Sequence, residues 1–102
     1  MRKYILTSLL VIVSWSIIYA QSSRIIEGLS FQSRILNMER KFSIYLPAGY
    51  TQNNRSYPVL YLLHGGGGDQ STWIQSGEVQ SITDKAISDG IATPMIIVMP
   101  NA

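Results

Sequence analysis

The sequence predicts an α/β fold in which an antiparallel pair of strands is followed by a strand–helix–strand unit. Two observations support this prediction. Residues 29–46 contain two segments in which apolar and polar residues alternate. Continuous apolar runs at Val59–Leu63 and Met95–Met99 then flank a stretch with helical periodicity. Such runs are typical of strands buried on both faces, and two of them joined through a helix normally lie parallel with a right-handed connection.

Residues 1–20 have the properties of a targeting segment. Arg2 and Lys3 precede an apolar stretch, residues 5–18, and Ala20 is a small residue at a suitable cleavage position. An uncleaved membrane anchor is the alternative, because no charge occurs between Lys3 and Arg24. We expect a signal peptide that is cleaved after Ala20, so that the remaining residues are secreted or periplasmic and are not held at the membrane.

The first predicted strand is Leu29–Leu36, and the residues that precede it are polar and lack a period, which predicts an irregular terminus up to Gly28. A turn is expected at Asn37–Arg40. The second strand, Lys41–Leu46, places Phe42, Ile44 and Leu46 on one face. Pro47 ends this strand because proline cannot donate to the sheet, and a turn and a polar surface loop lead to Tyr57.

The strand Val59–Leu63 is followed by His64 and by the glycine loop, Gly65–Gly68. Glycines allow positive φ and leave backbone N–H groups accessible, so such a loop after a buried strand suits an anion or an oxyanion. A dinucleotide fingerprint would require glycine where Gln70 stands, and no Gly-Lys-Ser/Thr follows, which excludes a phosphate-binding loop. A flexible connection to the next helix is the alternative.

The following helix is expected at Glu78–Asp89, with Ser76 as its N-cap and Gly90 just after its end. Its apolar stripe is formed by Val79, Ile82, Ala86 and Ile87. The acidic residues of the helix, including Asp84, are expected on its solvent-exposed side. Residues 69–77 are predicted to form a loop that is interrupted by the apolar pair Trp73-Ile74.

Charge and composition exclude several classes of partner. The formal charge of +2 comes from the leader, because the Lys and Arg residues beyond position 20 equal the Asp and Glu residues in number. We therefore expect no nucleic-acid partner. The sequence contains one histidine and no cysteine, so we expect no metal site and no cofactor.

The segments Phe42–Tyr50, Tyr57–Gly65, Trp73 and Met95–Ala102 resemble, in this order, the N-terminal part of the putative esterase family of α/β-hydrolases. This family includes feruloyl and acetyl-xylan esterases, S-formylglutathione hydrolases and mycolyltransferases, and the resemblance is greatest to the feruloyl esterase-like members. It extends over roughly residues 29–102. It implies an incomplete α/β-hydrolase fold, in which residues 21–102 are the truncated N-terminal part of an esterase domain.

The resemblance also implies the roles of the loop residues. The amide of Gly66, with that of Gly67 as a neighbouring candidate, would stabilise the negative oxygen of a tetrahedral intermediate. His64 and Gly65 would support the loop, since the catalytic histidine of α/β-hydrolases comes last in the chain. Trp73 either packs beneath the loop or forms a wall of the substrate pocket.

No Gly-x-Ser-x-Gly motif occurs in the sequence, so we expect none of the catalytic triad residues here and no activity from these residues alone. The resemblance implies a parent protein that is a secreted serine esterase. It would hydrolyse carboxylic esters, such as feruloyl or acetyl esters of polysaccharides, through an acyl-enzyme. The alternative is a non-catalytic exported binding protein that uses an exposed sheet edge to pair with its partner.

Overall fold

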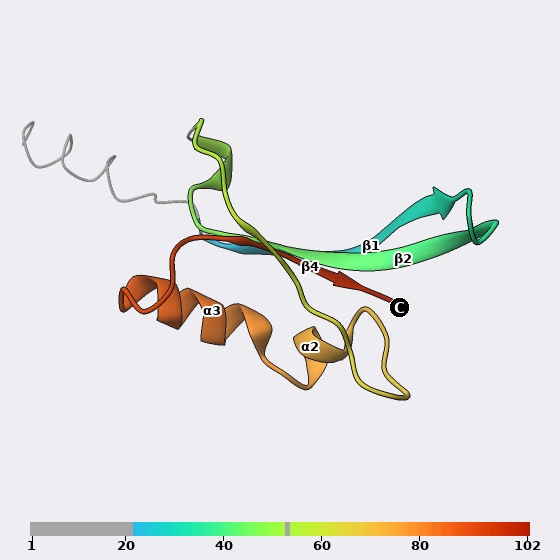
Figure 1. Ribbon diagram of the computed structural model, residues 1–102. Coiled ribbons are helices and arrows are strands. Elements are labelled where there is room, and N and C mark those ends of the chain that lie inside the picture. The colour runs from blue at the N-terminus through green and yellow to red at the C-terminus, as the bar shows by residue number, and fades with distance from the viewer. Residues whose placement is uncertain (1–21, 53) are drawn as a thin grey trace, which may run out of the picture.

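The computed structural model describes residues 22–52 and 54–102, and the expected signal peptide therefore lies outside the described residues. Four strands form one mixed sheet in the order β1-β2-β4-β3, and two helices lie on the same face of it (Figure 1). The elements are β1 (Arg24–Ser33), β2 (Met38–Leu46), η1 (Tyr50–Gln52), β3 (Val59–Tyr61), α2 (Thr72–Gln75), α3 (Val79–Ser88) and β4 (Ile96–Pro100). No helix in these ranges is long and apolar enough to span a bilayer.

β1 and β2 form the predicted antiparallel pair, and they project beyond the rest of the sheet as a long hairpin (Figure 1). β1 begins at Arg24, so the expected irregular terminus up to Gly28 is wrong. A register shift between Ile26 and Leu29, with φ of +73° at Gly28, interrupts the strand. This β-bulge breaks the alternation of apolar and polar residues, which is why periodicity alone does not reveal the first half of the strand.

The turn of the hairpin also differs from the prediction. β1 ends at Ser33 and β2 begins at Met38, so the turn occupies residues 34–37 rather than Asn37–Arg40. Asn37 has a φ of +50°, a conformation that asparagine tolerates better than most residues. The Ser33 hydroxyl accepts a hydrogen bond from the Leu36 amide at 3.2 Å. These local interactions, rather than hydrophobic periodicity, determine where the chain reverses.

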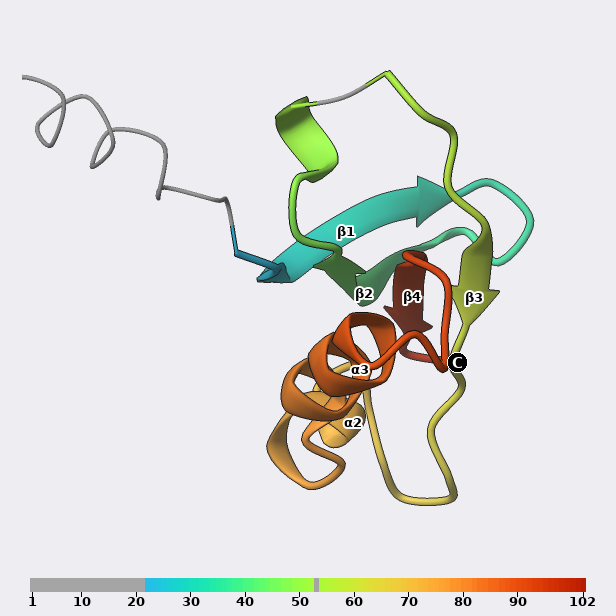
Figure 2. The ribbon, with the colours of Figure 1, turned by 90° about the vertical axis from the view of Figure 1, so that its left-hand side faces the viewer.

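The predicted strand–helix–strand unit is confirmed, because β3 and β4 are parallel and α3 lies in the connection between them. β4 has a second neighbour, β2, which pairs with it in antiparallel orientation. β3 lies at the edge of the sheet (Figure 2), and its central residue Leu60 is 45% exposed. The expected burial of Val59–Leu63 on both faces is therefore wrong for the described chain, because the two helices lie on one face of the sheet only (Figure 1) and β3 is its edge strand.

The hydrophobic core lies between β2, β4 and α3, and it is formed by Tyr45, Val79, Ile97 and Met99. The helix contributes Val79 and Thr83 as its buried residues, whereas Ile82 is 60% exposed. The predicted stripe is therefore wrong at Ile82. Positions four residues apart lie on the same face of a helix, so Thr83 occupies the buried position that follows Val79.

The two ends of α3 are stabilised differently. The residue before the helix is Glu78, which has a φ of +49° and makes no side-chain cap, so the prediction of Ser76 as N-cap is wrong. Ser76 is instead the C-cap of α2, the short helix that forms where a loop was expected. At the other end Gly90 has a φ of +75°, as expected of a residue that follows a helix.

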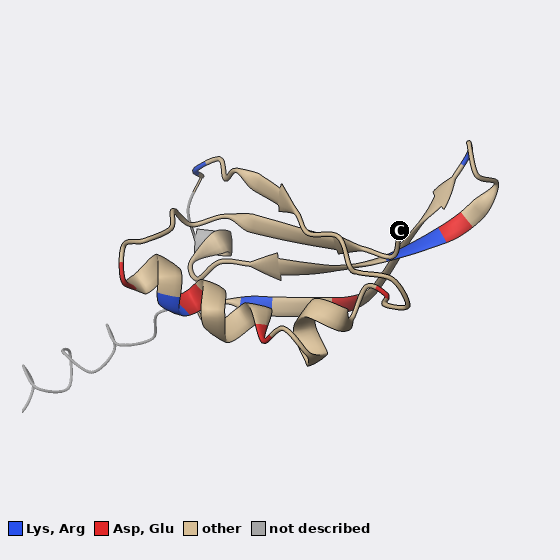
Figure 3. Ribbon diagram, turned by 60° about the horizontal axis from the view of Figure 1, so that its bottom comes forward, with Lys and Arg blue, Asp and Glu red and all other residues tan. Residues whose placement is uncertain are grey.

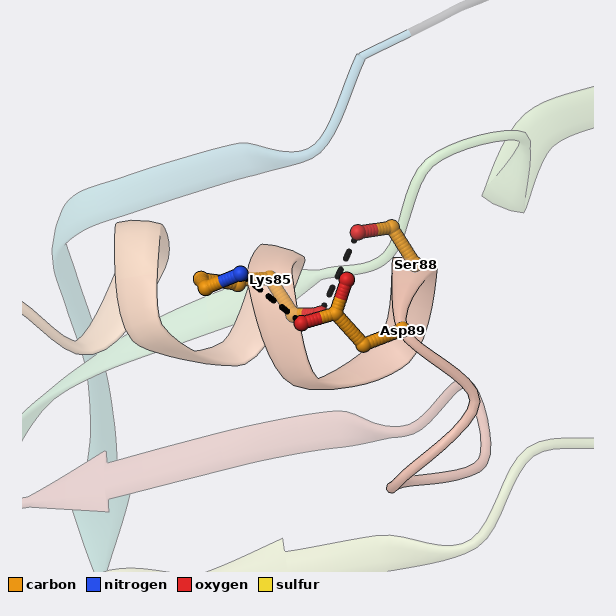
Figure 4. Close-up of polar contacts among 3 residues, drawn as sticks. All are labelled: Lys85, Ser88 and Asp89. Atoms are coloured by element: carbon orange, nitrogen blue, oxygen red, sulfur yellow. Dashed lines mark hydrogen bonds and ion pairs between the residues drawn. The ribbon is translucent and has the colours of Figure 1, made fainter.

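The last turn of α3 carries the polar contacts drawn in Figure 4. Lys85 Nζ lies 2.8 Å from Asp89 Oδ2, and the Ser88 hydroxyl donates to the Lys85 carbonyl at 3.1 Å. Both charged side chains are solvent-exposed. Exposed pairs of this kind contribute less than about 1 kcal/mol, so the position of α3 depends mainly on its buried face.

A polar cluster connects α3 to the sheet and to the start of the described chain. The Asp84 carboxylate accepts hydrogen bonds from the Tyr45 hydroxyl at 2.6 Å and from the Ser23 hydroxyl at 2.7 Å. Gln80 Nε2 donates to the Ser23 carbonyl at 3.2 Å. The expectation that Asp84 is a surface charge is wrong, because this residue is half-buried and bonded on both oxygens. Burial, aided by the Asp84 carboxylate, raises the pKa of the Tyr45 hydroxyl.

This raised pKa predicts an alkaline loss of stability that depends on Tyr45. The folded chain keeps the tyrosine proton, whereas the unfolded chain releases it above about pH 10, the usual pKa of tyrosine. The contribution of the Tyr45 hydroxyl to the free energy of unfolding is thus fully present below about pH 10. Above it, the free energy of unfolding falls by up to about 1.4 kcal/mol per pH unit. Urea denaturation at several alkaline pH values measures this slope. Tyr45→Phe should show a shallower decline, and identical slopes would contradict the assignment.

Candidate functional site

The glycine loop, Gly65–Gly68, begins at the carboxyl end of β3, where open α/β sheets typically bind their ligands. Two hydrogen bonds fix the chain just before the loop. The Leu62 amide donates to the Val98 carbonyl at 2.9 Å, which extends the pairing of β3 with β4. The Trp73 indole nitrogen donates to the Leu63 carbonyl at 2.9 Å. The loop therefore starts from a defined position despite its glycine content.

The four glycines form a tight turn. The Gly68 amide donates to the Gly65 carbonyl at 3.1 Å, and Gly67 has a φ of +80° whereas Gly66 does not have a positive φ. This combination is that of a type II turn, which requires positive φ at its third residue. Gly67 is thus the position in the loop where a side chain would strain the backbone.

The amides of Gly66 and Gly67 are available to a ligand. Both residues are exposed, and within residues 22–52 and 54–102 neither amide has a hydrogen-bond partner. A Cβ atom built on either residue meets nothing within 4 Å. The loop therefore presents two backbone N–H donors without steric obstruction, which is what the stabilisation of a developing negative charge requires.

His64 lies against the loop that follows it. Its Nδ1 atom is 2.7 Å from the Gly65 carbonyl oxygen. Its Nε2 atom is buried and has no partner among the described residues. No serine or carboxylate is hydrogen-bonded to this ring in that part of the chain, so the contact is with the loop and not with a catalytic partner.

The exit of the loop is ordered by residues that the sequence analysis did not single out. The Asp69 carboxylate accepts hydrogen bonds from the Ser71 hydroxyl at 2.6 Å and from the Ser71 amide at 2.8 Å. These bonds lower the pKa of Asp69, so the carboxylate stays ionised at neutral pH. The Thr72 hydroxyl accepts from the Asp69 amide at 2.9 Å. An aspartate commonly accepts a hydrogen bond from the backbone amide two residues further on, so Asp69 directly after the glycines could have indicated this motif.

Trp73 packs beneath the segment that leads into the loop. Besides its bond to Leu63, it borders the core, and a Cβ on Gly77 would come within 2.7 Å of its ring. A separate groove lies between β2 and α3 and is lined in part by Tyr45, Asp84 and Ile87. It includes neither Trp73 nor the glycine loop.

Charges of both signs occur on the same elements of the described chain. Lysines and arginines lie interspersed with aspartates and glutamates along β1, β2 and α3 (Figure 3). In the same residues no group of three His, Cys, Asp or Glu side chains could hold a metal ion.

Comparison with known proteins defines the class. The family model described as "Putative esterase" matches residues 33–102. The solved structure of a ferulic acid esterase superposes with a TM-score of 0.76 and 37% identity, covering 80% of this chain and 32% of that one. The fold is thus that of the α/β-hydrolase esterases, represented here by part of their sheet, and the chain belongs to the putative esterase family.

Two further proteins are similar to this chain. The endo-1,4-beta-xylanase/feruloyl esterase of Xylanibacter ruminicola is 36% identical over 78 residues, which are 72% of this chain and 11% of that protein. A mutant feruloyl esterase module from Clostridium thermocellum, complexed with sinapinate, is 34% identical with a TM-score of 0.68, covering 78% of this chain and 27% of that one. The chain therefore spans about a third or less of the length of these proteins.

The loop geometry predicts unequal tolerance at two neighbouring glycines. A Cβ on Gly68 would lie 2.7 Å from Thr72 Oγ1 and 3.2 Å from His64 Nδ1, whereas one on Gly66 meets nothing within 4 Å. Overpacking of this kind typically costs about 1–3 kcal/mol. We expect Gly68→Ala to lower the melting temperature and the matched variant Gly66→Ala to leave it nearly unchanged. Equal melting temperatures would contradict the described loop.

Proposed function

We propose that this chain supplies the oxyanion loop of a secreted serine esterase, with the amide of Gly66 as the principal donor and that of Gly67 as a neighbouring one. The observation that supports this most directly is the pair of exposed, unpartnered amides in a turn at the carboxyl end of β3. In the hydrolysis of an ester, these N–H groups would stabilise the carbonyl oxygen as it becomes negatively charged, where each donor is worth roughly 3–4 kcal/mol of the barrier.

The nucleophile, acid and base of the reaction are proposed to lie in a part of the protein beyond these residues. The sequence holds no Gly-x-Ser-x-Gly, and the chain covers 32% of the ferulic acid esterase structure. On this proposal residues 21–102 are the N-terminal part of the esterase domain and residues 1–20 are its cleaved signal peptide. The serine of that other part would take the acyl group as the C–O bond of the ester breaks and the alcohol leaves, and water would then hydrolyse the acyl-enzyme to release the carboxylic acid and the free serine.

The proposed substrates are carboxylic esters of aromatic acids, such as feruloyl esters carried by a polysaccharide. The support is the similarity to proteins named as feruloyl esterases, one of which was solved with sinapinate, and to a xylanase/feruloyl esterase. Trp73 is proposed to act by packing beneath the loop rather than as a pocket wall, since its indole nitrogen is bonded to the Leu63 carbonyl.

The test begins with the exported protein purified from its natural source. Its intact mass is measured, it is treated with a fluorophosphonate that labels reactive serines, and hydrolysis of methyl ferulate is followed before and after labelling. We expect a mass well above that of residues 21–102, one labelled serine outside them, and loss of hydrolysis on labelling. A mass equal to residues 21–102, with no labelling, would refute the esterase proposal and favour a binding protein that uses the exposed edge of β3.

A further inference from the structure

We infer that His64 is a positioning residue: its imidazole fixes the plane of the peptide between Gly65 and Gly66 and thereby aims the Gly66 amide. The carbonyl oxygen of Gly65 can only accept hydrogen bonds, so the Nδ1 atom 2.7 Å away must carry the proton. The neutral ring is therefore the Nδ1–H tautomer, with Nε2 as an acceptor. Nε2 is the buried atom that lacks a partner among the described residues.

The Gly65 carbonyl is held from two directions. Besides the imidazole, the Gly68 amide donates to the same oxygen at 3.1 Å. A carbonyl oxygen has two lone pairs, so both acceptor sites are occupied. The Gly68 amide closes the turn. The His64 side chain fixes how the plane of the peptide between Gly65 and Gly66 is tilted within that turn. Steric contacts do not restrict Gly65, Gly66 or Gly67, since a Cβ atom built on any of them would meet nothing within 4 Å.

Peptide planarity transfers this constraint to the proposed oxyanion donor. The C=O of Gly65 and the N–H of Gly66 belong to one rigid unit and point in opposite directions. Holding the carbonyl inward therefore directs the Gly66 amide outward, toward solvent. The Gly67 amide belongs to the next peptide, which is joined to the first through the rotatable bonds of Gly66 and to the following one at a φ of +80° at Gly67. The hydrogen bond of His64 is to the Gly65 carbonyl and not to this peptide. The geometry thus distinguishes Gly66, as the preorganised donor, from Gly67.

The backbone next to His64 and the space around its ring are also constrained. His64 follows directly after Leu63, whose carbonyl is bonded by the Trp73 indole. On the other side, the Nδ1 atom lies 3.2 Å from the position that a Cβ on Gly68 would occupy. The absence of a side chain at Gly68 therefore leaves the room in which the ring sits. A histidine held in this way can orient a peptide that glycines alone would leave mobile.

Three variants test this inference. His64→Leu removes the donor, His64→Asn places an amide N–H where Nδ1 was, and His64→Gln moves the amide one bond further out. On the isotopically labelled chain, we expect the order parameter of the Gly66 amide to fall from about 0.85 to below about 0.6 in His64→Leu and His64→Gln, and to remain high in His64→Asn. Long-range ¹H–¹⁵N spectra of the unsubstituted chain should show a proton on Nδ1 and none on Nε2.

The second measurement uses the exported esterase and rests on the proposed function. We expect kcat for methyl ferulate to fall about ten- to a hundredfold in His64→Leu, somewhat less than when a donor is deleted, with KM nearly unchanged and with most of kcat restored in His64→Asn. If His64→Asn loses as much as His64→Leu in both measurements, or if the Gly66 order parameter is the same in all variants, the inference is overturned. A protein without esterase activity would refute the proposed function alone, because the order parameters still test the role of His64.

Discussion

In the proposed esterase, Gly66→Pro is expected to lower kcat for ester hydrolysis by about 10²–10³-fold, which is the loss typical of removing one oxyanion donor. Proline lacks the backbone N–H that we propose to stabilise the developing negative charge. Its ring should fit, because Gly66 is the second residue of a type II turn, where a φ near −60° makes proline common. A Cβ at this position meets nothing within 4 Å. The substitution therefore removes the donor while the turn is retained.

Gly66→Ala is the matched control, since it adds a side chain but keeps the amide. We expect its kcat to remain within a few-fold of the unsubstituted protein, and both variants to keep similar melting temperatures. The Michaelis constant should change little in either, because the interaction forms fully only in the transition state. If Gly66→Pro and Gly66→Ala have equal kcat values, the Gly66 amide is not an oxyanion donor. Gly67 would then be the candidate to examine.

Trp73→Ala is expected to lower the free energy of unfolding by roughly 3 kcal/mol, toward the lower end of the range for removing a buried tryptophan because the side chain is half-buried. The variant loses the packing of the ring against the core and against Gly77, together with the bond from the indole nitrogen to the Leu63 carbonyl. Since the total free energy of unfolding of most domains is only about 5–15 kcal/mol, this loss should be evident in urea denaturation.

Trp73→Phe separates the two roles considered for this residue. Phenylalanine keeps much of the packing but cannot donate to Leu63, so we expect a loss of about 1 kcal/mol, the usual net value of one hydrogen bond. If Trp73 acts by packing, the Michaelis constant for methyl ferulate should not change in Trp73→Phe. A large increase in that constant with unchanged stability would instead identify Trp73 as a wall of the substrate pocket.

Much of the architecture could be predicted because it depends on local sequence. The antiparallel pair, the parallel unit β3–α3–β4 and the stop at Gly90 follow from periodicity and from glycine conformation. The predictions that were wrong depend on interactions between distant residues. The bulge at Gly28 hides half of β1, and the pairing with β2 is what keeps that half extended. Asp84 looks like an exposed helix charge until Tyr45 and Ser23 are brought beside it.

For the glycine loop, too, some features could be predicted from the sequence and others depend on the structure. From the sequence one can identify a side-chain-free loop after an apolar strand and one histidine before it, and a family resemblance gives these residues their expected roles. Which glycine has positive φ, which amides are left without partners and what the histidine contacts depend on the turn that the loop adopts. Four glycines allow too many backbone conformations for local preference to select one.

The sequence by itself therefore determined the class of fold and the order of the four strands and α3, and it indicated where a candidate site lies, whereas the short helix α2 was not predicted. Hydrophobic periodicity and glycine placement are local properties, and they are read directly along the chain. The tertiary structure decided which strands have two neighbours, which face of α3 is buried and how the peptide between Gly65 and Gly66 is oriented. These features arise from contacts between residues far apart in the sequence or from the closing of a turn. The hydrophobic pattern of a single segment predicts neither the contacts nor the turn.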